Sequence, residues 1–324
     1  MLRVVFLGSP PFATPVFSSL VASTRHSAVA LVTKPDKPRG RGMHVQASPL
    51  VELARAHAIP VLQPERARGP EFLEALRAFA PDVLLVASYG EILRQDVLDV
   101  APRGAFNVHA SLLPRHRGAS PIQAAILAGD EETGVAVQRM VLALDEGDVV
   151  YEERTRIGPH ENAGQLLARL ADLGAVAALR ALDAIEDGTA REQPQDPTHA
   201  TYARRIKKEE GAVDWTLDAI AIDRHVRART PWPGARTHAP GGAELALTDV
   251  RPLERDPREL PGTVLETRGA LVVACGRGAL EIRALKPAGK GPVDALAWLR
   301  GARIELGARF GATTAGTEGP GAAP

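Results

Sequence analysis

The chain has few of the features that mark disulfides, thiolate metal sites and membrane spans. Only one of its 324 residues is a cysteine, Cys275. A single cysteine forms no internal disulfide and no multi-cysteine metal site, and it favours a reducing compartment. We expect Cys275 to be a small buried hydrophobic residue. No stretch approaches the ~20 apolar residues of a membrane span, and the apolar amino-terminal run is too short for a signal peptide. The sequence therefore predicts a cytoplasmic protein that does not enter a membrane.

The first predicted turn lacks the glycines of a dinucleotide-binding site. An apolar strand over residues 3–7 is followed by Gly8-Ser9-Pro10-Pro11, where a G-x-G-x-x-G fingerprint would stand. Proline has no N–H group with which to bind phosphate. A nicotinamide cofactor is therefore disfavoured. The sequence also has no H-E-x-x-H or comparable cluster, so we predict no metal site.

An excess of charge of one sign is absent as well. Lys plus Arg and Asp plus Glu both number 39, and the formal net charge is zero. Residues 205–324 nevertheless carry three more basic than acidic side chains. This weak polarity is compatible with a basic face on the carboxyl-terminal half that contacts nucleic acid. It does not establish one, since most of these charges are expected on solvated surface.

The first part of the chain alternates strand and helix patterns. Unbroken apolar runs such as 82–88 predict strands buried on both faces of a parallel sheet. A long Ala/Leu-rich amphipathic pattern over 164–187 predicts a helix that ends at Gly188. The fold class expected for residues 1–188 is α/β, a Rossmann-like doubly wound domain.

The pattern changes in the second part of the chain. Residues 189–208 are predicted to be a linker that includes the extended stretch 193–198. Short alternating runs separated by Gly, Pro and Asp then predict a small antiparallel β-barrel over 209–310. Residues 311–324 are predicted to be a disordered tail, because Gly, Ala and Thr dominate them.

The residues most indicative of chemistry lie in the segment 107–121, NVHASLLPRHRGASP. Asn107 and His109 occupy alternate positions at the end of a predicted strand, so both project from one face. Ligands bind beyond the carboxyl ends of strands in open α/β sheets. An amide and an imidazole there suit a reaction in which a carbonyl oxygen gains charge while a proton moves. Asp145, in a later loop, can orient the imidazole or accept a proton.

These residues predict acyl transfer to an amine that attacks directly. Ser111 is expected to bind substrate and not to act as a nucleophile, since no G-x-S-x-G elbow surrounds it. A glycine-rich basic loop over 34–44 carries Arg41 between two glycines. This loop is either solvated surface or a flap that contacts an anionic substrate.

The segment 107–121, together with Asp145, resembles that of the folate-dependent formyltransferases. The resemblance implies transfer of a formyl group from 10-formyltetrahydrofolate to an amine. The stretches 33–50, 201–215, 231–233 and 286–290 resemble those of members that formylate the initiator methionyl-tRNA. The resemblance covers roughly residues 2–310.

The resemblance also implies roles for individual residues. Asn107, His109 and Asp145 take the catalytic positions, and His116 stands where the family commonly has an aromatic residue. The folate would contact two segments, here Ser111, Leu112, Leu113 and Pro114 and, at the edge of the pterin pocket, Tyr89, Ile92 and Leu93. The carboxyl-terminal barrel is the part that resembles an oligonucleotide-binding (OB-like) fold. The tRNA would contact basic residues, here Arg41, Lys207, Lys208, Lys286 and Lys290. We expect the protein to act as a monomer.

Two alternatives remain open. Formyltransferases that act on a glycinamide ribonucleotide or an amino sugar nucleotide share the Asn/His/Asp set, so only the Arg41 loop and the barrel distinguish them from the tRNA-specific members. A non-enzymatic RNA-binding protein on the same scaffold would not need Asn107, His109 and Asp145 together.

Overall fold

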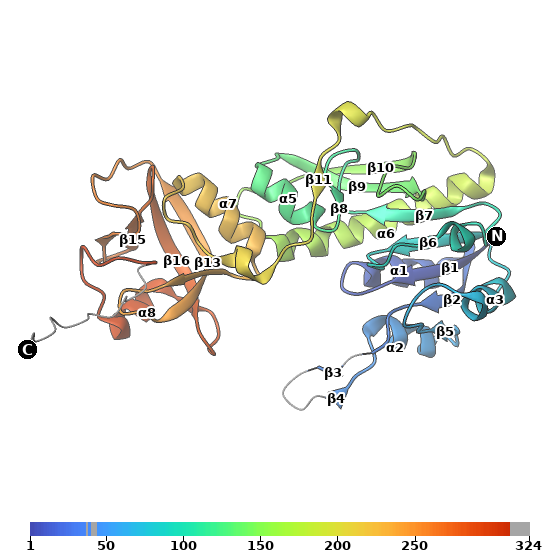
Figure 1. Ribbon diagram of the computed structural model, residues 1–324, viewed down its shortest axis with the longest axis horizontal. Helices are drawn as coiled ribbons and strands as arrows, with labels where there is room; N and C mark the ends of the chain where they lie inside the picture. The colour runs from blue at the N-terminus through green and yellow to red at the C-terminus, as the bar shows by residue number, and fades with distance from the viewer. Residues whose placement is uncertain (37, 40–43, 312–324) are drawn as a thin grey trace, which may run out of the picture. The chain divides into compact units, whose positions relative to one another are not determined.

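The computed structural model describes residues 1–36, 38–39 and 44–311 and divides into two compact units (Figure 1). Unit 1 comprises residues 1–125, 130–158 and 165–205. Unit 2 comprises residues 126–129, 159–164 and those from Ile206 onward. Arg41 and, apart from Gly311, the predicted tail lie outside the described residues.

Unit 1 is built on a seven-stranded sheet in the order β10-β9-β7-β6-β1-β2-β5, which runs from top to bottom in Figure 1. Strands β5, β2, β1, β6 and β7 pair in parallel, whereas β9 is antiparallel to β7 and β10 to β9. The predicted α/β sheet is therefore confirmed, with an antiparallel pair added at one edge. The strands are β1 (Leu2–Gly8), β2 (His26–Val32), β5 (Val61–Leu62), β6 (Val83–Ala87), β7 (Ala105–His109), β9 (Glu132–Arg139) and β10 (Val149–Arg156).

The middle strands are buried because their sequences are continuously apolar. All five residues of β6 are buried, as expected for a strand between two parallel neighbours with both faces covered. Helix α2 (Pro49–Ala56) begins where local capping favours it: the Ser48 side chain accepts a hydrogen bond from the Val51 N–H, and Pro49 occupies the first turn. The helices of this part of the chain are α1 (Ala13–Val21), α2 (Pro49–Ala56), α3 (Pro70–Ala78), α4 (Gln95–Leu98), α5 (Pro121–Ala128) and α6 (Ala163–Asp187).

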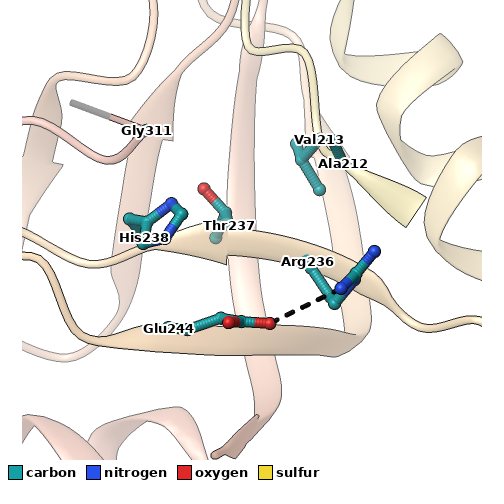
Figure 2. A pocket seen from close by; sticks show the side chains of 7 residues that line it. All are labelled: Ala212, Val213, Arg236, Thr237, His238, Glu244 and Gly311. Carbon is teal, nitrogen blue, oxygen red and sulfur yellow. Dashed lines mark ion pairs between the residues drawn. The ribbon is translucent and has the colours of Figure 1, made fainter. Parts of the chain in front are cut away.

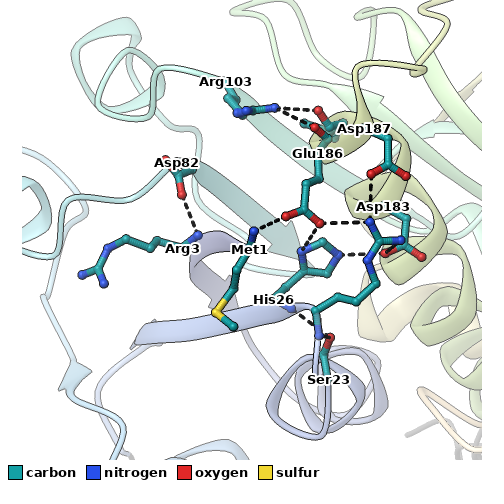
Figure 3. Close-up of polar contacts among 11 residues, drawn as sticks. Met1, Arg3, Ser23, His26, Asp82, Arg103, Asp183, Glu186 and Asp187 are labelled. Carbon is teal, nitrogen blue, oxygen red and sulfur yellow. Dashed lines mark hydrogen bonds and ion pairs between the residues drawn. The ribbon is translucent and has the colours of Figure 1, made fainter.

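A polar cluster joins the carboxyl end of α6 to the start of β1 and β2 (Figure 3). The buried His26 ring lies 3.0 Å from Asp183 Oδ1, and Arg25 contacts Asp183 and Asp187 at 3.0 and 2.9 Å. The Met1 amine contacts Glu186. Cationic groups are favourable at a helix carboxyl end, where the macrodipole is negative. The cluster therefore fixes the far end of the long helix against the sheet.

Several short elements escaped the sequence patterns. Two of them, β8 (Arg117–Gly118) and β11 (Tyr202–Ala203), pair in parallel. The pairing attaches the predicted linker to the segment that follows β7. The other short elements are β3 (Pro38–Arg39), β4 (His44–Val45) and the 3-10 helices Pro197–His199 and Lys208–Gly211.

Unit 2 is antiparallel, as predicted for a small β-barrel, and its sheet curls into a half-barrel. The sheet has the strand order β12-β13-β16-β15-β14, with β17 paired to β16. In its core the ring centroids of Trp215 and Phe310 are 5.8 Å apart, and the Trp215 indole N–H donates a hydrogen bond to Thr237 Oγ1. The elements are α7 (Ala219–Arg229), β12 (Ala235–His238), β13 (Glu244–Leu253), β14 (Val264–Glu266), β15 (Leu271–Ala274), β16 (Ala279–Pro287), β17 (Val293–Asp294) and α8 (Ala295–Ala302).

Cys275 is buried in this core, as predicted. Burial, assisted by the charge of Asp218, raises the pKa of its thiol to about 12. Only about 10⁻⁴ of the thiol is then ionised at pH 8, against roughly a quarter for an ordinary cysteine. We expect a thiol-reactive dye at pH 8 to label the native chain at least ~10³-fold more slowly than the chain in denaturant. Equal labelling rates would contradict this burial.

Candidate active site

Asn107 and His109 lie at the carboxyl-terminal end of β7, in the middle of the unit 1 sheet. Asn107 is opposite Val86 of β6 on one side and opposite Gln138 of β9 on the other. Residues directly opposite in an antiparallel pair project from the same face. The sheet therefore brings Asn107, His109 and Gln138 to one face beyond the end of β7.

The carboxylate of Asp145 closes this cluster. Its Oδ1 accepts hydrogen bonds from Gln138 Nε2 at 2.8 Å and Asn107 Nδ2 at 3.4 Å, and its Oδ2 accepts one from the Gly118 N–H at 2.8 Å. Asp145 itself has a φ of 53°, in the left-handed region that is unfavourable for a residue with a Cβ. The predicted grouping of Asn107, His109 and Asp145 is therefore present in the structure.

The partners of His109 determine which of its ring nitrogens faces the cluster. Its Nε2 lies 3.0 Å from the carbonyl oxygen of His116. A carbonyl only accepts hydrogen bonds, so Nε2 carries the proton and donates it. The Nδ1 atom is 3.8 Å from Asp145 Oδ2, close enough for an ion pair but too far for a hydrogen bond. His109 is only 5% exposed, and Nδ1 is the nitrogen left to act on a substrate.

The segment after β7 is held by its own polar contacts. Ser111 is fully buried, and its hydroxyl donates to the Arg115 carbonyl at 2.6 Å. Leu113 is buried, while Leu112 and Pro114 are half-buried. Ser111 therefore shapes the loop from inside, and Leu112 and Pro114 are its more accessible members.

His116 anchors the far side of this loop. Its N–H donates to Thr201 Oγ1 at 2.8 Å, and its Nε2 is 2.7 Å from Asp130 Oδ2. Burial alone would raise the pKa of Asp130, but hydrogen bonds from Arg115 and His116 outweigh it and lower the pKa below its usual value. The carboxylate of Asp130 thus stays ionised, and the loop is fixed where the His116 carbonyl meets His109.

The loop after β6 carries the other predicted folate residues, but they are not equally accessible. Tyr89 and Leu93 are 2% and 3% exposed, whereas Ile92 is 80% exposed. Burial, with a smaller contribution from Glu91, raises the pKa of Tyr89 to about 12. A pocket of about 600 Å³ opens beside this loop, lined by Lys34, Pro35, Glu65, Arg66, Arg68, Gly90 and Glu91. Ile92 is the apolar side chain of the set that a ligand can reach directly.

The predicted tRNA-contacting lysines all belong to unit 2. Lys207, Lys208, Lys286 and Lys290 are exposed. Unit 2 also contains a pocket of about 340 Å³, in which Arg236 of β12 and Glu244 of β13 form an ion pair at 3.8 Å (Figure 2). The four lysines are therefore accessible to a binding partner, and the structure alone does not identify that partner.

Three polar residues of the cluster were missed by the sequence analysis. Gln138 had a usable sequence signal, because it directly follows the apolar residues 135–137 of β9. In the structure it is 2% exposed. Arg117 is 4% exposed and contacts Gln195 and Glu146 at 2.9 and 3.1 Å. Gln195 had no local signal, since it lies in a polar, proline-rich stretch.

The described residues hold neither a cluster of metal-ligating side chains nor a helix suited to a membrane. Within residues 1–36, 38–39 and 44–311, no group of three or more His, Cys, Asp or Glu side chains is arranged to hold a metal ion. Across the same described part of the chain, none of the helices combines the length and hydrophobicity needed to cross a membrane.

Both units match protein families. Residues 2–182 match the formyl transferase family, and residues 205–303 match the formyl transferase C-terminal domain. The methionyl-tRNA formyltransferase of Solibacter usitatus (strain Ellin6076) is 43% identical over 310 residues, which cover 96% of this chain and 99% of that protein. The methionyl-tRNA formyltransferase of Methylobacterium sp. (strain 4-46) is 44% identical over 310 residues, with 95% and 99% covered.

Solved structures share the fold at lower identity. The N-formyltransferase from Helicobacter canadensis, in complex with folinic acid and dTDP-3-aminofucose, has a TM-score of 0.62 at 14% identity and covers 89% of this chain and 100% of its own. HypX from Aquifex aeolicus, in complex with tetrahydrofolic acid, has a TM-score of 0.60 at 19% identity. It covers 92% of this chain, which spans about half (47%) of HypX. At these identities the likeness shows the fold alone.

Proposed function

Because this chain belongs to the formyl transferase family, we propose that it transfers the formyl group of 10-formyltetrahydrofolate to the amino group of initiator methionyl-tRNA. The observation that carries this proposal is the convergence of Asn107, His109 and Asp145 beyond the end of β7. In the balanced reaction, a bond forms between the methionyl nitrogen and the formyl carbon, and the bond from that carbon to N10 of the folate breaks. One proton passes from the methionyl amine to N10.

The residues near the site fit a folate. Its fused ring offers two faces for apolar contacts and carries nitrogen and oxygen atoms at its edges. The folate would supply the formyl group when bound. Leu112 and Pro114 after β7 and Ile92 after β6 offer apolar contacts, and β6 and β7 are parallel neighbours. These loops follow carboxyl ends of adjacent strands, where ligands bind in open α/β sheets. We assign Ser111, Leu113, Tyr89 and Leu93 to shaping these loops from within.

The three polar residues divide the chemistry between them. An amide carries two N–H groups, so Asn107 can contact Asp145 and still donate to a substrate oxygen. Such a donor, aimed where negative charge develops, contributes about 3 kcal/mol to transition-state stabilisation. His109 presents Nδ1, which when protonated can donate to the same oxygen. The Asp145 carboxylate stabilises that charged ring and can accept the proton of the amine, directly or through water.

The assignment of the acceptor depends on basic residues that do not belong to this cluster. Methionyl-tRNA is a polyanion, and its binding is expected to rest on phosphate contacts that weaken steeply with salt. The exposed Lys207, Lys208, Lys286 and Lys290 of unit 2 suit such contacts, as does Arg41. A small acceptor needs none of them. We propose that the protein works in the cytoplasm as a monomer.

The direct test supplies 10-formyltetrahydrofolate with charged initiator tRNA and, separately, with glycinamide ribonucleotide and amino sugar nucleotides. We expect acid-stable formyl label on methionyl-tRNA alone. Formylation of only the small acceptors would overturn the tRNA assignment while keeping formyl transfer. No transfer to any acceptor would overturn the proposed activity.

We expect Arg41→Ala to raise KM for methionyl-tRNA about tenfold or more, because phosphate contacts dominate tRNA binding. The dissociation constant of the folate should stay within about twofold, since folate is assigned to other loops. Arg154→Ala is the control, because Arg154 is an exposed arginine of β10 in unit 1. An equal loss of tRNA and folate binding would remove Arg41 from acceptor recognition.

A further inference from the structure

The segment between the two family matches folds against the turn that carries Asp145. Gln195 belongs to this segment and lies outside both matched regions, 2–182 and 205–303. Its side-chain amide nitrogen donates to the backbone carbonyls of Asp145 at 2.9 Å and Gly147 at 2.7 Å. The same nitrogen is 3.1 Å from Gln138 Oε1, and Gln138 itself donates to the Asp145 carboxylate. One side chain therefore contacts both ends of the turn and one of the donors to its carboxylate.

Arg117 fixes which way the Gln195 amide faces. The Nε and Nη2 atoms of Arg117 lie 3.0 and 2.9 Å from Gln195 Oε1. A guanidinium has only donors, so the amide oxygen must face Arg117 and the amide nitrogen must face the turn. Arg117 is in turn held by Glu146 at 3.1 Å and by the ring of Tyr202, whose centroid is 5.9 Å away. The orientation of Gln195 is therefore set by a buried, well-contacted cation.

The turn needs such support because of its backbone. Asp145 has a φ of 53°, which is unfavourable for a residue with a Cβ. In this conformation of the turn its carboxylate accepts hydrogen bonds from Asn107, Gln138 and the Gly118 N–H. The Gln195 amide donates hydrogen bonds to the carbonyls of Asp145 and Gly147 in this conformation. These hydrogen bonds stabilise it relative to conformations in which they are not made.

We propose that Gln195 is a positioning residue for Asp145: it holds the 145–147 turn so that the carboxylate faces Asn107 and His109. The inference rests on the proposed function, because it assigns Asp145 to the formyl transfer. It adds a contribution to the reaction from a segment that neither matched family region contains. Gln195 acts through Asp145 and does not itself touch the reacting atoms.

Two substitutions in the full-length chain separate this role from a merely structural one. In Gln195→Glu, one carboxylate oxygen can still accept hydrogen bonds from Arg117, and its negative charge strengthens this contact. The other oxygen replaces the amide N–H groups and places an acceptor against the Asp145 and Gly147 carbonyls, which are also acceptors. Gln195→Met keeps the size and removes both donor and acceptor. The control is Gln193→Glu, since Gln193 has an exposed side chain and pairs with Val149 through its backbone. It makes the same change of charge in the same segment.

We expect Gln195→Glu and Gln195→Met each to lower kcat for methionyl-tRNA about ten- to a hundredfold, because small displacements of a catalytic group cost this much. The KM values of both substrates should stay within about threefold, and Gln193→Glu should match the wild type. If Gln195 only fastens the segment to Arg117, Gln195→Glu will keep the wild-type kcat, and that result would overturn the proposal. A rise in KM without loss of kcat would do the same.

A second measurement does not depend on activity. The Gly118 amide donates to Asp145 Oδ2, so its hydrogen exchange reports the position of that carboxylate. We expect exchange at Gly118 to speed up at least tenfold in both Gln195 variants and not in Gln193→Glu. Unchanged exchange at Gly118 in both Gln195 variants would overturn the positioning role, whatever the activity assays show. Faster exchange with an inactive wild type would leave the positioning of Asp145 standing and overturn the proposed function alone.

Discussion

His109→Ala is expected to lower kcat about 10²- to 10⁴-fold, the usual contribution of a positioned acid or base. The variant loses the Nδ1 atom that faces Asp145, while the backbone carbonyl of His116 remains where the loop holds it. Folate binding should change little, because the apolar loop residues are untouched. Single-turnover formylation and equilibrium folate binding, measured on the same preparation, separate the two effects.

His199→Ala is the matched control, because the His199 side chain is 73% exposed and contacts Asp196 on the surface. It should formylate at the wild-type rate. A His109→Ala variant with normal turnover would remove His109 from the mechanism. A variant that loses folate affinity in proportion to turnover would instead assign His109 to binding.

Asp145→Asn should lower kcat by a comparable factor, about 10²- to 10³-fold, with almost no change in shape. An amide in this position turns an N–H group toward one of its neighbours, and Asn107, Gln138 and the Gly118 N–H all donate to the native carboxylate. A donor would then face a donor, and the negative charge opposite His109 would be lost.

The control for this variant is Asp148→Asn, the same change three residues along the same loop. We expect it to retain wild-type kcat. Full activity in Asp145→Asn would show that a neutral side chain suffices at this position. That outcome would exclude Asp145 as the proton acceptor.

The regular elements could be predicted from the sequence because each has a strong local pattern. The apolar run of β6 and the amphipathic pattern of α6 are long and end at recognisable boundaries. The strand positions of Asn107 and His109 followed from the same patterns, since alternate residues share a face. Asp145 was grouped with these two residues as an acidic side chain of a later loop that can serve the imidazole, and the family resemblance implied the same three residues.

The contacts that hold the site are long-range and left little trace in the sequence. Gln195 and Asp145 are brought together by folding of the chain, and the two-residue strands β8 and β11 are too short to have a periodicity. The accessibility of the loop after β6 was equally hidden. Tyr89 and Ile92 are three positions apart, but one is in the core and the other is 80% exposed. Composition alone does not distinguish them.

The pairing of β8 with β11 has a consequence for dividing the protein into fragments. Gly118 has a φ of 107°, and a Cβ there would lie 2.7 Å from the Ala203 carbonyl oxygen. Strand β11 is therefore packed closely against the backbone that donates to Asp145. A fragment cut after α6, at Gly188, would keep every candidate catalytic residue but lose Gln195, Thr201 and β11. The shortest piece that retains the intact site ends at Ala203 or beyond, although the sheet and its helices are complete well before that residue.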